Sequence, residues 1–378
     1  MRICIDLTAL ADNLSGIERY AACLTLEMLK HENDYFILLF KDNVHEIFKP
    51  HVNKKNINCV VILRCNKLIF NQIRLPLIIH KIKADWYLFM AFPVPILSFK
   101  RNMVSTIHDI CCWDCPETMN GLSNWYFHIS HRVALTKCKA IITISNFSKK
   151  RIHEKLKYPN DKIWLVYCGI DHKKFTVHSD RIAIVREKYI LPSEYILSLS
   201  TLEPRKNLPL LIRAYEDLIE QGENLPELVL AGRKGWKMDK FLDSITPEVK
   251  KRIIFTGFID DKDIPELYAM AKFFIFPSMY EGFGMPPLEA MSCGTPVVTS
   301  DSSSLPEVLG NTTVYFKNNN LDDLKKKIIE MNKMTQNARN TLSVSGIKQS
   351  RKYNWTKEAE KLYGFLVSNN GRKRFSQT

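Results

Sequence analysis

The sequence has no hydrophobic run long enough to cross a bilayer. Its longest nearly uncharged apolar stretch, residues 86–99, is interrupted by Pro93 and Pro95, and a membrane-spanning helix needs about 20 apolar residues. A secretory leader is not recognisable either. Met1-Arg2 leads directly into Ile3-Cys4-Ile5, which is too short for the apolar core of a signal peptide. We therefore expect a cytoplasmic protein.

Motifs that mark several large enzyme classes are also missing. There is no Walker phosphate loop and no Gly-x-Ser-x-Gly nucleophile turn. The loop after the first predicted strand, Asn13-Leu14-Ser15-Gly16-Ile17, lacks the glycine spacing of a dinucleotide fingerprint. No acidic residue follows it at the expected distance on a second strand, which argues against a nicotinamide or flavin enzyme.

Paired cysteines are scarce, although the chain contains ten cysteines. Only Cys112-Trp113-Asp114-Cys115 has the spacing of metal ligands, and no second Cys or His pair lies at a useful interval. Reduced, buried cysteines are the better interpretation. We expect neither disulfides nor a bound metal.

What the sequence does contain is an ordinary globular composition with an excess of basic residues. Hydrophobic residues make up 46% and charged residues 25% of the 378, which excludes collagen-like and largely disordered chains and indicates two domains. Lys and Arg number 54 and Asp and Glu 40, so the formal charge is +14. This charge predicts an acidic partner, namely nucleic acid, an anionic membrane or a phosphorylated substrate.

The basic excess is concentrated in the first half of the chain. Residues 51–101 contain nine Lys or Arg and one acid, Asp85. The run 68–75 mixes apolar and basic residues, and two interpretations stay open: a helix on a membrane surface, or the solvated face of a core helix. The terminal Arg372-Lys373-Arg374 is either a second membrane contact or a disordered end.

Short apolar runs alternate with longer amphipathic ones, which predicts an α/β protein with mainly parallel sheets. We expect two Rossmann-like, doubly wound domains, residues 1–180 and 190–354, with a ligand cleft between the carboxyl ends of their strands. The seam is placed between Phe175 and Ser193. The predicted strands are 1–7, 35–40, 59–63, 86–90, 103–107, 140–145, 163–167, 195–200, 227–231, 253–257, 273–277 and 296–300. The predicted helices include 17–29, 145–157, 207–220, 263–270, 286–293, 321–331 and 355–366.

The strongest chemical signal follows the predicted strand 273–277. In the segment Tyr280-Glu281-Gly282-Phe283-Gly284-Met285-Pro286-Pro287-Leu288-Glu289, the two prolines suit the first turn of a helix. The glycines then form a tight loop at a helix amino terminus, where free N–H groups and the dipole attract anions. Glu281 and Glu289 suit hydrogen bonds to sugar hydroxyls, although each alone is common as a loop acid or a first-turn acid.

Other predicted strand ends carry further candidates. Arg205 and Lys206 suit a diphosphate, and Gly232-Arg233-Lys234-Gly235 is a weaker candidate for the same cleft. His108 stands at the carboxyl end of the strand 103–107, although a single histidine is more often structural than catalytic. Asp261-Lys262-Asp263 has the form of a metal-binding motif, but it precedes a predicted helix and is better interpreted as a helix cap.

Taken in order, these segments resemble the retaining GT-B glycosyltransferases of family 4. The spacing of Glu281 and Glu289 matches the E-x7-E motif of that family, and seven ordered pieces are highly specific. The sequence departs from the family pattern at Ser200, where many relatives have glycine. This departure affects the expected contacts to the donor phosphates and not the family resemblance. The segment Ser304-Leu305-Pro306-Glu307-Val308 matches the part of the family pattern beyond the E-x7-E motif. The seven matching pieces are Gly16, Thr106-Ile107-His108-Asp109, Ile144-Ser145-Asn146-Phe147-Ser148, Val166-Tyr167-Cys168-Gly169-Ile170-Asp171, Leu202-Glu203-Pro204-Arg205-Lys206-Asn207, Phe255-Thr256-Gly257-Phe258 and Pro277-Ser278-Met279-Tyr280-Glu281-Gly282-Phe283-Gly284.

The resemblance implies a donor site in the second domain. Arg205 and Lys206 would hold the donor diphosphate, and Glu289 would bind the nucleotide ribose. Glu281 would act at the reacting sugar by contacting its hydroxyls. The backbone N–H groups of Phe283, Gly284 and Met285 would assist Glu281. No metal is required in this scheme, because cations and the helix dipole stabilise the departing nucleoside diphosphate.

The resemblance also implies contributions from elsewhere in the chain. The backbone near Gly257 and Phe258 would meet the base, and His108 would lie by the 6-position of the sugar. Gly16 would let the first domain close on the phosphates. The last helix, within residues 355–378, would pack back on the first domain.

The function that the resemblance implies is hexosyl transfer in the synthesis of bacterial O-antigen or capsular polysaccharide, with formation of an α-linkage. We expect mannose from GDP-mannose, with dTDP-rhamnose or a UDP-hexose as alternatives. The acceptor would be a lipid-linked or lipopolysaccharide-type glycan at the inner face of the membrane, and the basic first domain would touch that anionic surface. Other polysaccharide-assembly enzymes are further candidate partners, and nucleic acid is not expected.

A rival from another class is a non-catalytic basic protein that binds nucleic acid or an anionic membrane. Such a protein would interleave aromatic and basic residues on one face and would have no carboxylates in a cleft. The pair Glu281 and Glu289 therefore argues against it.

Overall fold

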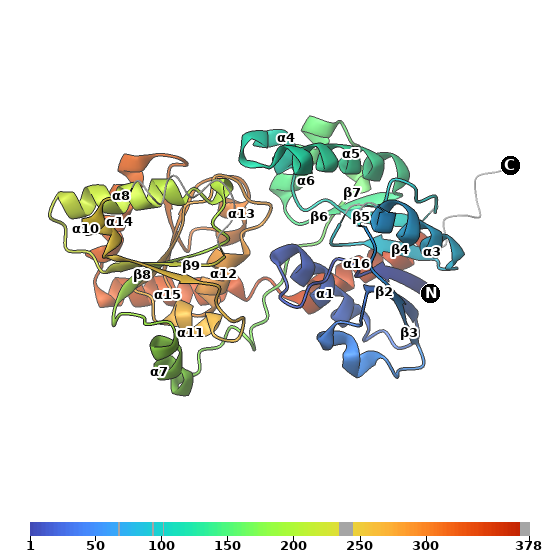
Figure 1. Ribbon diagram of the computed structural model, residues 1–378, viewed down its shortest axis with the longest axis horizontal. Coiled ribbons are helices and arrows are strands. Elements are labelled where there is room, and N and C mark those ends of the chain that lie inside the picture. Colours follow the sequence, from blue (N-terminus) through green and yellow to red (C-terminus); the bar gives the residue numbers. More distant parts are fainter. Residues whose placement is uncertain (67–68, 93, 101, 234–244, 371–378) are drawn as a thin grey trace. The chain divides into compact units, whose positions relative to one another are not determined.

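The computed structural model describes residues 1–66, 69–92, 94–100, 102–233 and 245–370 (Figure 1). Contacts within the chain divide it into two units. Unit 1 comprises Met1–Pro116, Asn120–Gly169 and Asn354–Thr378, and unit 2 comprises Glu117–Met119 and Ile170–Tyr353. The chain thus passes between the units at Gly169–Ile170, before the predicted domain boundary at residue 180.

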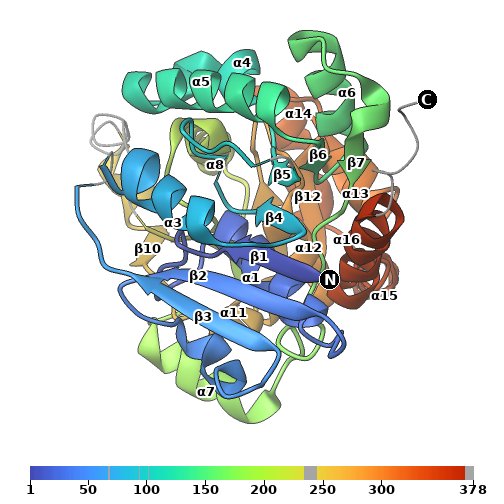
Figure 2. The same cartoon turned by 90° about the vertical axis from the view of Figure 1, so that its right-hand side faces the viewer.

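Unit 1 is built on a seven-stranded sheet in the order β3-β2-β1-β4-β5-β6-β7, with every pairing parallel. Figure 2 shows β3, β2, β1, β4 and β5 side by side in this order. The strands are β1 (Arg2–Asp6), β2 (Tyr35–Lys41), β3 (Ile57–Ile62), β4 (Trp86–Phe89), β5 (Met103–Thr106), β6 (Ala140–Thr143) and β7 (Ile163–Leu165). The helices of unit 1 are α1 (Gly16–Met28), η1 (Glu46–His51), η2 (Phe70–Arg74), α3 (Leu75–Lys81), α4 (Cys111–Asp114), α5 (Gly121–Lys137), α6 (Asn146–Leu156), η4 (Asn160–Lys162) and α16 (Trp355–Asn370). The short helix η3 (Pro116–Thr118) lies where the chain enters the segment 117–119 of unit 2.

Unit 2 repeats this plan with a six-stranded parallel sheet in the order β10-β9-β8-β11-β12-β13. The strands are β8 (Tyr195–Leu199), β9 (Glu227–Ala231), β10 (Ile253–Gly257), β11 (Phe273–Phe276), β12 (Val297–Ser300) and β13 (Val314–Phe316). The helices are α7 (Ser179–Lys188), η5 (Pro204–Lys206), α8 (Leu208–Glu220), α10 (Pro247–Lys250), α11 (Ile264–Ala269), α12 (Met285–Ser292), α13 (Leu305–Leu309), α14 (Leu321–Asn332) and α15 (Gln336–Ser350).

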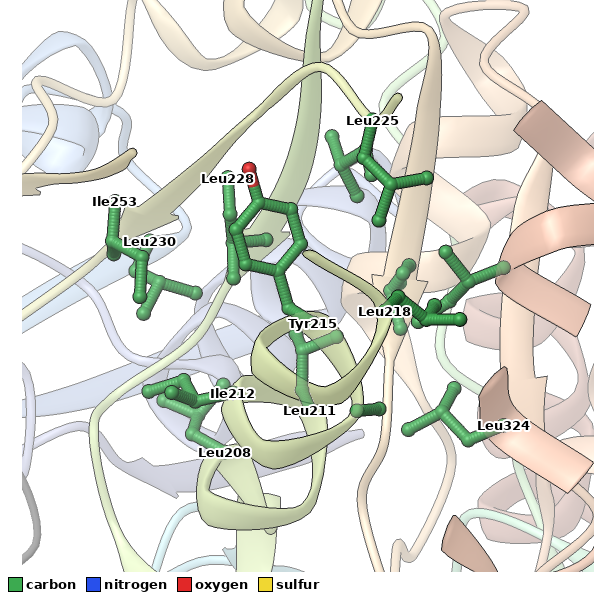
Figure 3. Close-up of a cluster of buried hydrophobic side chains, with 14 of the residues drawn as sticks. Leu208, Leu211, Ile212, Tyr215, Leu218, Leu225, Leu228, Leu230, Ile253 and Leu324 are labelled. Atoms are coloured by element: carbon green, nitrogen blue, oxygen red, sulfur yellow. The ribbon is translucent and has the colours of Figure 1, made fainter. Parts of the chain in front are cut away.

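The cores form where apolar helix faces cover the sheets. On α8, apolar residues recur every three or four positions, so that Leu208, Leu211 and Leu218 are all buried against the sheet. Figure 3 shows Tyr215 of α8 pointing towards Leu228 of β9 within this cluster. The strands are apolar on both faces because a parallel sheet is covered on both sides.

The last helix belongs to unit 1. Glu358 of α16 accepts a hydrogen bond of 2.9 Å from the Tyr167 backbone N–H. The ring of Phe365 lies 5.6 Å from the ring of Trp86 on β4. This helix therefore completes the packing of the first sheet, although it comes last in the chain (Figure 1).

Most of the predicted helices and strands are confirmed. One strand, the burial of the cysteines and the role of Asp263 differ from the predictions. The strand β13 was not predicted. None of the ten cysteines, all within the described residues, is in a disulfide, and four of them are only partly buried rather than buried as expected. Asp263 does occupy the position before α11, yet its side chain makes no cap. Instead it accepts hydrogen bonds from Lys188 (2.6 Å) and Tyr189 (3.0 Å), so the predicted capping role is wrong and the carboxylate ties α11 to the end of α7.

Two segments, residues 68–75 and 372–374, were predicted as possible membrane contacts. Along 69–75, Phe70 and Leu75 are buried whereas Ile69 and Ile73 are about half exposed, so one face is core and the other is open. Leu68 and Arg372-Lys373-Arg374 lie outside the described residues. Among the described helices, none combines the length and the apolar character needed to cross a membrane.

Candidate functional site

The predicted glycine loop connects β11 to α12 in unit 2. Gly284 takes φ +97°, which L side chains rarely adopt, and a Cβ there would lie 2.5 Å from Leu305 Cδ2. Met285 begins α12, and Pro286 and Pro287 occupy its first turn. The backbone therefore turns sharply at Gly284 into the amino terminus of α12, as the sequence predicted.

Glu281 is the centre of the loop's polar contacts and is buried. Its Oε1 accepts hydrogen bonds of 2.6 Å from Lys206 Nζ and 2.6 Å from Ser278 Oγ, and Oε2 accepts one of 3.2 Å from Arg205 Nη1. Burial alone would raise the pKa of Glu281. The charges of Arg205 and Lys206 outweigh that effect and hold the pKa below its ordinary value. Glu281 is therefore an ionised carboxylate held in one orientation.

The backbone of Glu281 is fixed by two serines that the sequence reasoning gave no role. Ser303 Oγ accepts a 2.8 Å hydrogen bond from the Glu281 N–H, and Ser304 Oγ donates one of 2.9 Å to its carbonyl. Both serines follow β12, the neighbour of β11. The sequence offered one indication of this contact. Ser304-Leu305-Pro306 belongs to a segment that matches the family pattern beyond Glu289.

Arg205 and Lys206 lie in η5, directly after β8. Arg205 Nη1 donates to the Tyr280 carbonyl at 2.9 Å, and its Nη2 donates to Glu203 Oε1 at 3.0 Å. Burial and the neighbouring Arg205 cation lower the pKa of Lys206. Two cations and two carboxylates, Glu203 and Glu281, thus form one paired cluster, of which the sequence reasoning missed Glu203.

Two more predicted residues lie on the elements around this cluster. Glu289 is on α12, is buried, and accepts a 3.4 Å hydrogen bond from the Tyr268 hydroxyl on α11. Ser200, the departure from the family pattern, follows β8. It is buried, and its hydroxyl has no hydrogen-bond partner among the described residues.

The predicted base-binding segment lies at the end of β10. Gly257 ends the strand with φ +67°. Phe258 is exposed, and the Arg233 guanidinium lies 4.5 Å from the centre of its ring. An exposed aromatic ring at a strand's carboxyl end is a surface on which a planar base can stack. Lys234 and Gly235 lie outside the described residues.

The remaining predicted residues lie in unit 1. His108 follows β5 and is partly buried, and its Nε2 is 2.8 Å from the Met90 carbonyl oxygen. A carbonyl only accepts, so Nε2 carries the proton and Nδ1 is the free acceptor. Burial lowers the pKa of His108, which keeps the ring neutral at pH 7. Gly16 begins α1, and apart from its chain neighbours and its own helix backbone no atom of the described residues lies within 4 Å of the position a Cβ would take there.

The structure therefore brings Arg205, Lys206 and Glu281 into direct contact. It places Phe283, Gly284 and Met285 in the same loop and helix start. The clustering of His, Cys, Asp and Glu side chains gives no metal site with three or more ligands in the described part of the chain.

Comparison with known proteins agrees with this geometry. The family model described as glycosyl transferases group 1 matches residues 182–349, and the model described as glycosyltransferase family 4 matches residues 14–174. Over 257 residues the chain is 34% identical to the O-antigen chain mannosyltransferase B of Escherichia coli, covering 68% of this chain and 67% of the relative. It is 31% identical over 272 residues to the serotype-specific mannosyltransferase WbdA of Escherichia coli. That alignment covers 70% of this chain but only 33% of WbdA.

Solved structures share the fold at low sequence identity. HepE of Anabaena, in complex with UDP and glucose, superposes with a TM-score of 0.74 at 19% identity and covers 97% of this chain and 100% of that one. WaaG, a glycosyltransferase involved in lipopolysaccharide biosynthesis, gives 0.72 at 14% identity, with coverage of 97% and 100%. The chain thus has the GT-B fold, in which two units with parallel sheets follow one another in the sequence.

Proposed function

Since this chain belongs to the group 1 and family 4 glycosyltransferases and has their GT-B fold, we propose that it is a retaining mannosyltransferase. It would transfer mannose from GDP-mannose to a lipid-linked or lipopolysaccharide-type glycan in O-antigen synthesis, leaving an α-linkage. The mannosyltransferases from Escherichia coli support the choice of sugar. The enzyme would work at the inner face of the membrane.

The observation that carries this proposal is the buried cluster of Arg205, Lys206 and Glu281 beside a helix amino terminus. A nucleoside diphosphate would bring its negative charge into a site that holds two cations and the amino terminus of α12. As the bond to the sugar breaks, charge develops on the leaving phosphate, and these groups stabilise it without a metal. The departing phosphate would also help to remove the acceptor proton on the same face of the sugar.

The other site residues receive roles in the same scheme. Glu281 is held ionised by its neighbours and would accept hydrogen bonds from the donor sugar. Glu289 would bind the ribose, and Phe258 with Gly257 would meet the base. His108 offers Nδ1 as an acceptor for the 6-hydroxyl. Gly16 fits a place where a phosphate approaches the backbone, because nothing within unit 1 itself requires a glycine there.

A first experiment measures thermal stabilisation of the purified protein by GDP, UDP, dTDP, their sugars and NAD, with a metal chelator present. A ligand at a hundred times its dissociation constant adds about 2.7 kcal/mol, which raises the melting midpoint by a few degrees. We expect selective shifts with GDP and GDP-mannose. A shift with UDP or dTDP instead replaces the donor by a UDP-hexose or dTDP-rhamnose, and no shift at all favours the non-catalytic basic protein.

A second experiment separates catalysis from folding. Glu281→Gln removes the charge but keeps an oxygen that can accept from Ser278 and Lys206. We expect the variant to fold and to bind GDP but to melt at a lower temperature, because Lys206 loses its counter-charge. Sugar transfer, measured well below that melting temperature, should fall by at least about a hundredfold, a typical effect of losing one transition-state contact. Glu330→Gln on α14, an exposed carboxylate, is the matched control. Unchanged transfer in Glu281→Gln would contradict the assigned role.

A further inference from the structure

Arg233 is an exposed cation beside the proposed base-binding segment, and the proposed reaction gives it no role. It follows Gly232 just beyond the carboxyl end of β9. Its guanidinium lies 4.5 Å from the centre of the Phe258 ring. No acidic side chain among the described residues forms an ion pair with it. The five N–H groups of this guanidinium can therefore bind a ligand.

The backbone around Arg233 is held by the strand ends beside it. The Gly232 N–H donates to the Gly257 carbonyl at 2.8 Å, and the Arg233 carbonyl accepts a 2.9 Å hydrogen bond from the Leu202 N–H. Gly232 has φ +130°, and a Cβ there would lie 1.9 Å from the Ser200 carbonyl oxygen. Arg233 therefore projects from a close-packed turn, which fixes where its side chain begins.

These contacts also relate Phe258 to the cations that would hold the diphosphate. Leu202, which bonds to Arg233, lies three residues before Arg205 in the segment that leads from β8 to η5. Phe258 follows β10, and β9 lies between β8 and β10 in the sheet. Two strand spacings amount to about 10 Å, which is comparable with the reach of a nucleotide from its base to its diphosphate. A nucleotide along this edge of the sheet would contact both groups.

The bases of the candidate donors differ in the acceptors that they offer to a guanidinium. Guanine has two adjacent acceptors, O6 and N7, and a planar guanidinium can donate to both at once. Adenine has an amino donor beside N7, and thymine and uracil offer only the carbonyl O4 on the corresponding edge. An arginine beside the base therefore favours guanine over the other bases.

The contact between Arg233 and Phe258 leaves room for a base. A cation–π contact at an exposed site is weak, and a base that stacks on an aromatic ring is held more strongly. The base would therefore replace the guanidinium on the face of Phe258, and the guanidinium would move to the edge of the base. Phe258 is 43% exposed, so its ring is accessible for this exchange.

We propose that Arg233 selects a guanine nucleotide by donating two hydrogen bonds, to O6 and N7 of a base that stacks on Phe258. This inference deepens the proposed function and rests on it for the presence of a nucleotide donor. It assigns the choice between GDP, UDP and dTDP to one side chain.

The test compares dissociation constants for GDP, UDP and 7-deaza-GDP, in which a carbon replaces N7, by isothermal titration calorimetry of the full chain. Arg233→Met removes the charge and the hydrogen bonds and keeps an apolar side chain beside Phe258. Arg233→Lys keeps a cation that can still donate to guanine. The matched control is Arg213→Met on α8, where the side chain is likewise exposed.

We expect the wild type and the control to bind GDP about tenfold more tightly than 7-deaza-GDP, because N7 accepts a hydrogen bond from a charged group. In Arg233→Met, GDP should bind at least about tenfold more weakly than in the wild type, and the two guanine nucleotides should bind alike. UDP binding should stay within about twofold of its wild-type value, because uracil lacks the acceptor pair. Arg233→Lys should keep part of the preference for GDP over 7-deaza-GDP.

The ratio of two dissociation constants within one variant does not depend on how much of that variant is folded. Equal weakening of GDP, UDP and 7-deaza-GDP in Arg233→Met would make Arg233 a ligand of the shared diphosphate and overturn the inference. The wild-type ratio of GDP to 7-deaza-GDP in Arg233→Met would remove Arg233 from the base and leave the proposed function intact. Binding of UDP without GDP by the wild type would overturn the proposed donor and this inference together.

Discussion

Two cationic regions of this molecule differ in how their charges are neutralised. In unit 2, Arg205 and Lys206 are mostly buried and each is paired with a carboxylate, Glu203 or Glu281. In unit 1, Arg2, Lys83 and Lys100 line one pocket at the starts of β1, β4 and β5. Of these, Arg2 and Lys83 are exposed and form no ion pair within the described part of the chain. A buried charge must be paired at fixed geometry, whereas an exposed charge is already satisfied by water.

This difference gives the two regions different uses. A paired, buried cluster presents its groups in one orientation, which suits a reaction that depends on position. Unpaired exposed cations attract any anionic surface and tolerate many orientations, which suits docking. Mutations should therefore be costly to the fold in the first region and nearly silent in the second.

The largest expected effect on stability is that of Glu281→Ala. This change leaves Lys206 buried without its carboxylate, so the free energy of unfolding should fall by about 3–5 kcal/mol. Urea unfolding followed by circular dichroism measures the loss, and the double variant Glu281→Ala/Lys206→Met should recover part of it. A wild-type midpoint in Glu281→Ala would show that the cluster is not coupled as its distances indicate.

The next effect concerns His131, a buried residue of unit 1 that forms no ion pair with any described acidic residue. Burial, with smaller contributions from His128 and His108, lowers the pKa of His131 to about 4. Between pH 6.5 and 4 the unfolded chain binds a proton at this site and the folded chain does not. Stability should therefore fall with falling pH by about 3 kcal/mol over this window.

The variant His131→Gln should flatten this part of the pH profile, measured as the urea midpoint against pH. The exposed His178 supplies the control His178→Gln, which should leave the slope unchanged. Glu281 contributes separately. Because its folded pKa lies below its ordinary value, its stabilisation is present at neutral pH and is lost only at more acidic pH. An unchanged slope in His131→Gln would contradict the neutral state of the buried ring.

A smaller effect compares two glycines at helix starts. Gly284→Ala forces a side chain into φ +97° and towards Leu305, so it should cost about 1–3 kcal/mol. Gly16→Ala meets no atom within 4 Å, and its melting temperature should stay at the wild-type value or rise slightly. If Gly16 faces the donor phosphates, transfer should still fall in Gly16→Ala. A fully active Gly16→Ala would remove that role.

The smallest expected effect is that of replacing an exposed cation of unit 1. Lys83→Gln should change the free energy of unfolding by less than about 0.5 kcal/mol, because the side chain is exposed and unpaired. Urea unfolding of Lys83→Gln and Glu281→Ala, measured side by side, compares the two free energies of unfolding. A loss above about 1 kcal/mol, the size of a typical destabilising mutation, would mean that Lys83 has a structural partner.

Much of the fold was predictable because parallel strands buried on both faces are apolar throughout. The buried strand β9 was predicted to the residue and β11 to within one residue, and α8 shows a clear apolar stripe. The helices α5 and α15 carry weaker signals, because their buried residues include Ser130, His131, Gln349 and Ser350 rather than an apolar stripe. The short strand β13 has only three residues, too few for a periodic pattern.

For the site, the loop residues and the basic pair were predictable from local motifs, but their partners were not. Asp263 looked like a helix cap because local sequence cannot reveal that Lys188 and Tyr189 of α7 lie beside it. Ser303 and Ser304 became visible as the support of Glu281 only when β12 was placed next to β11. The fold brings together residues that are far apart in the chain.

The sequence by itself determined the α/β class, the parallel sheets, the glycine turn into α12 and the set of family motifs, because each depends on nearby residues and their spacing. Only the tertiary structure decided that Glu281 is ionised between Arg205 and Lys206. It alone decided that His108 is partly buried with its proton on Nε2, and that Arg2, Lys83 and Lys100 share one pocket. Protonation and pairing follow from burial and from neighbours across the sheet, and a linear sequence contains neither.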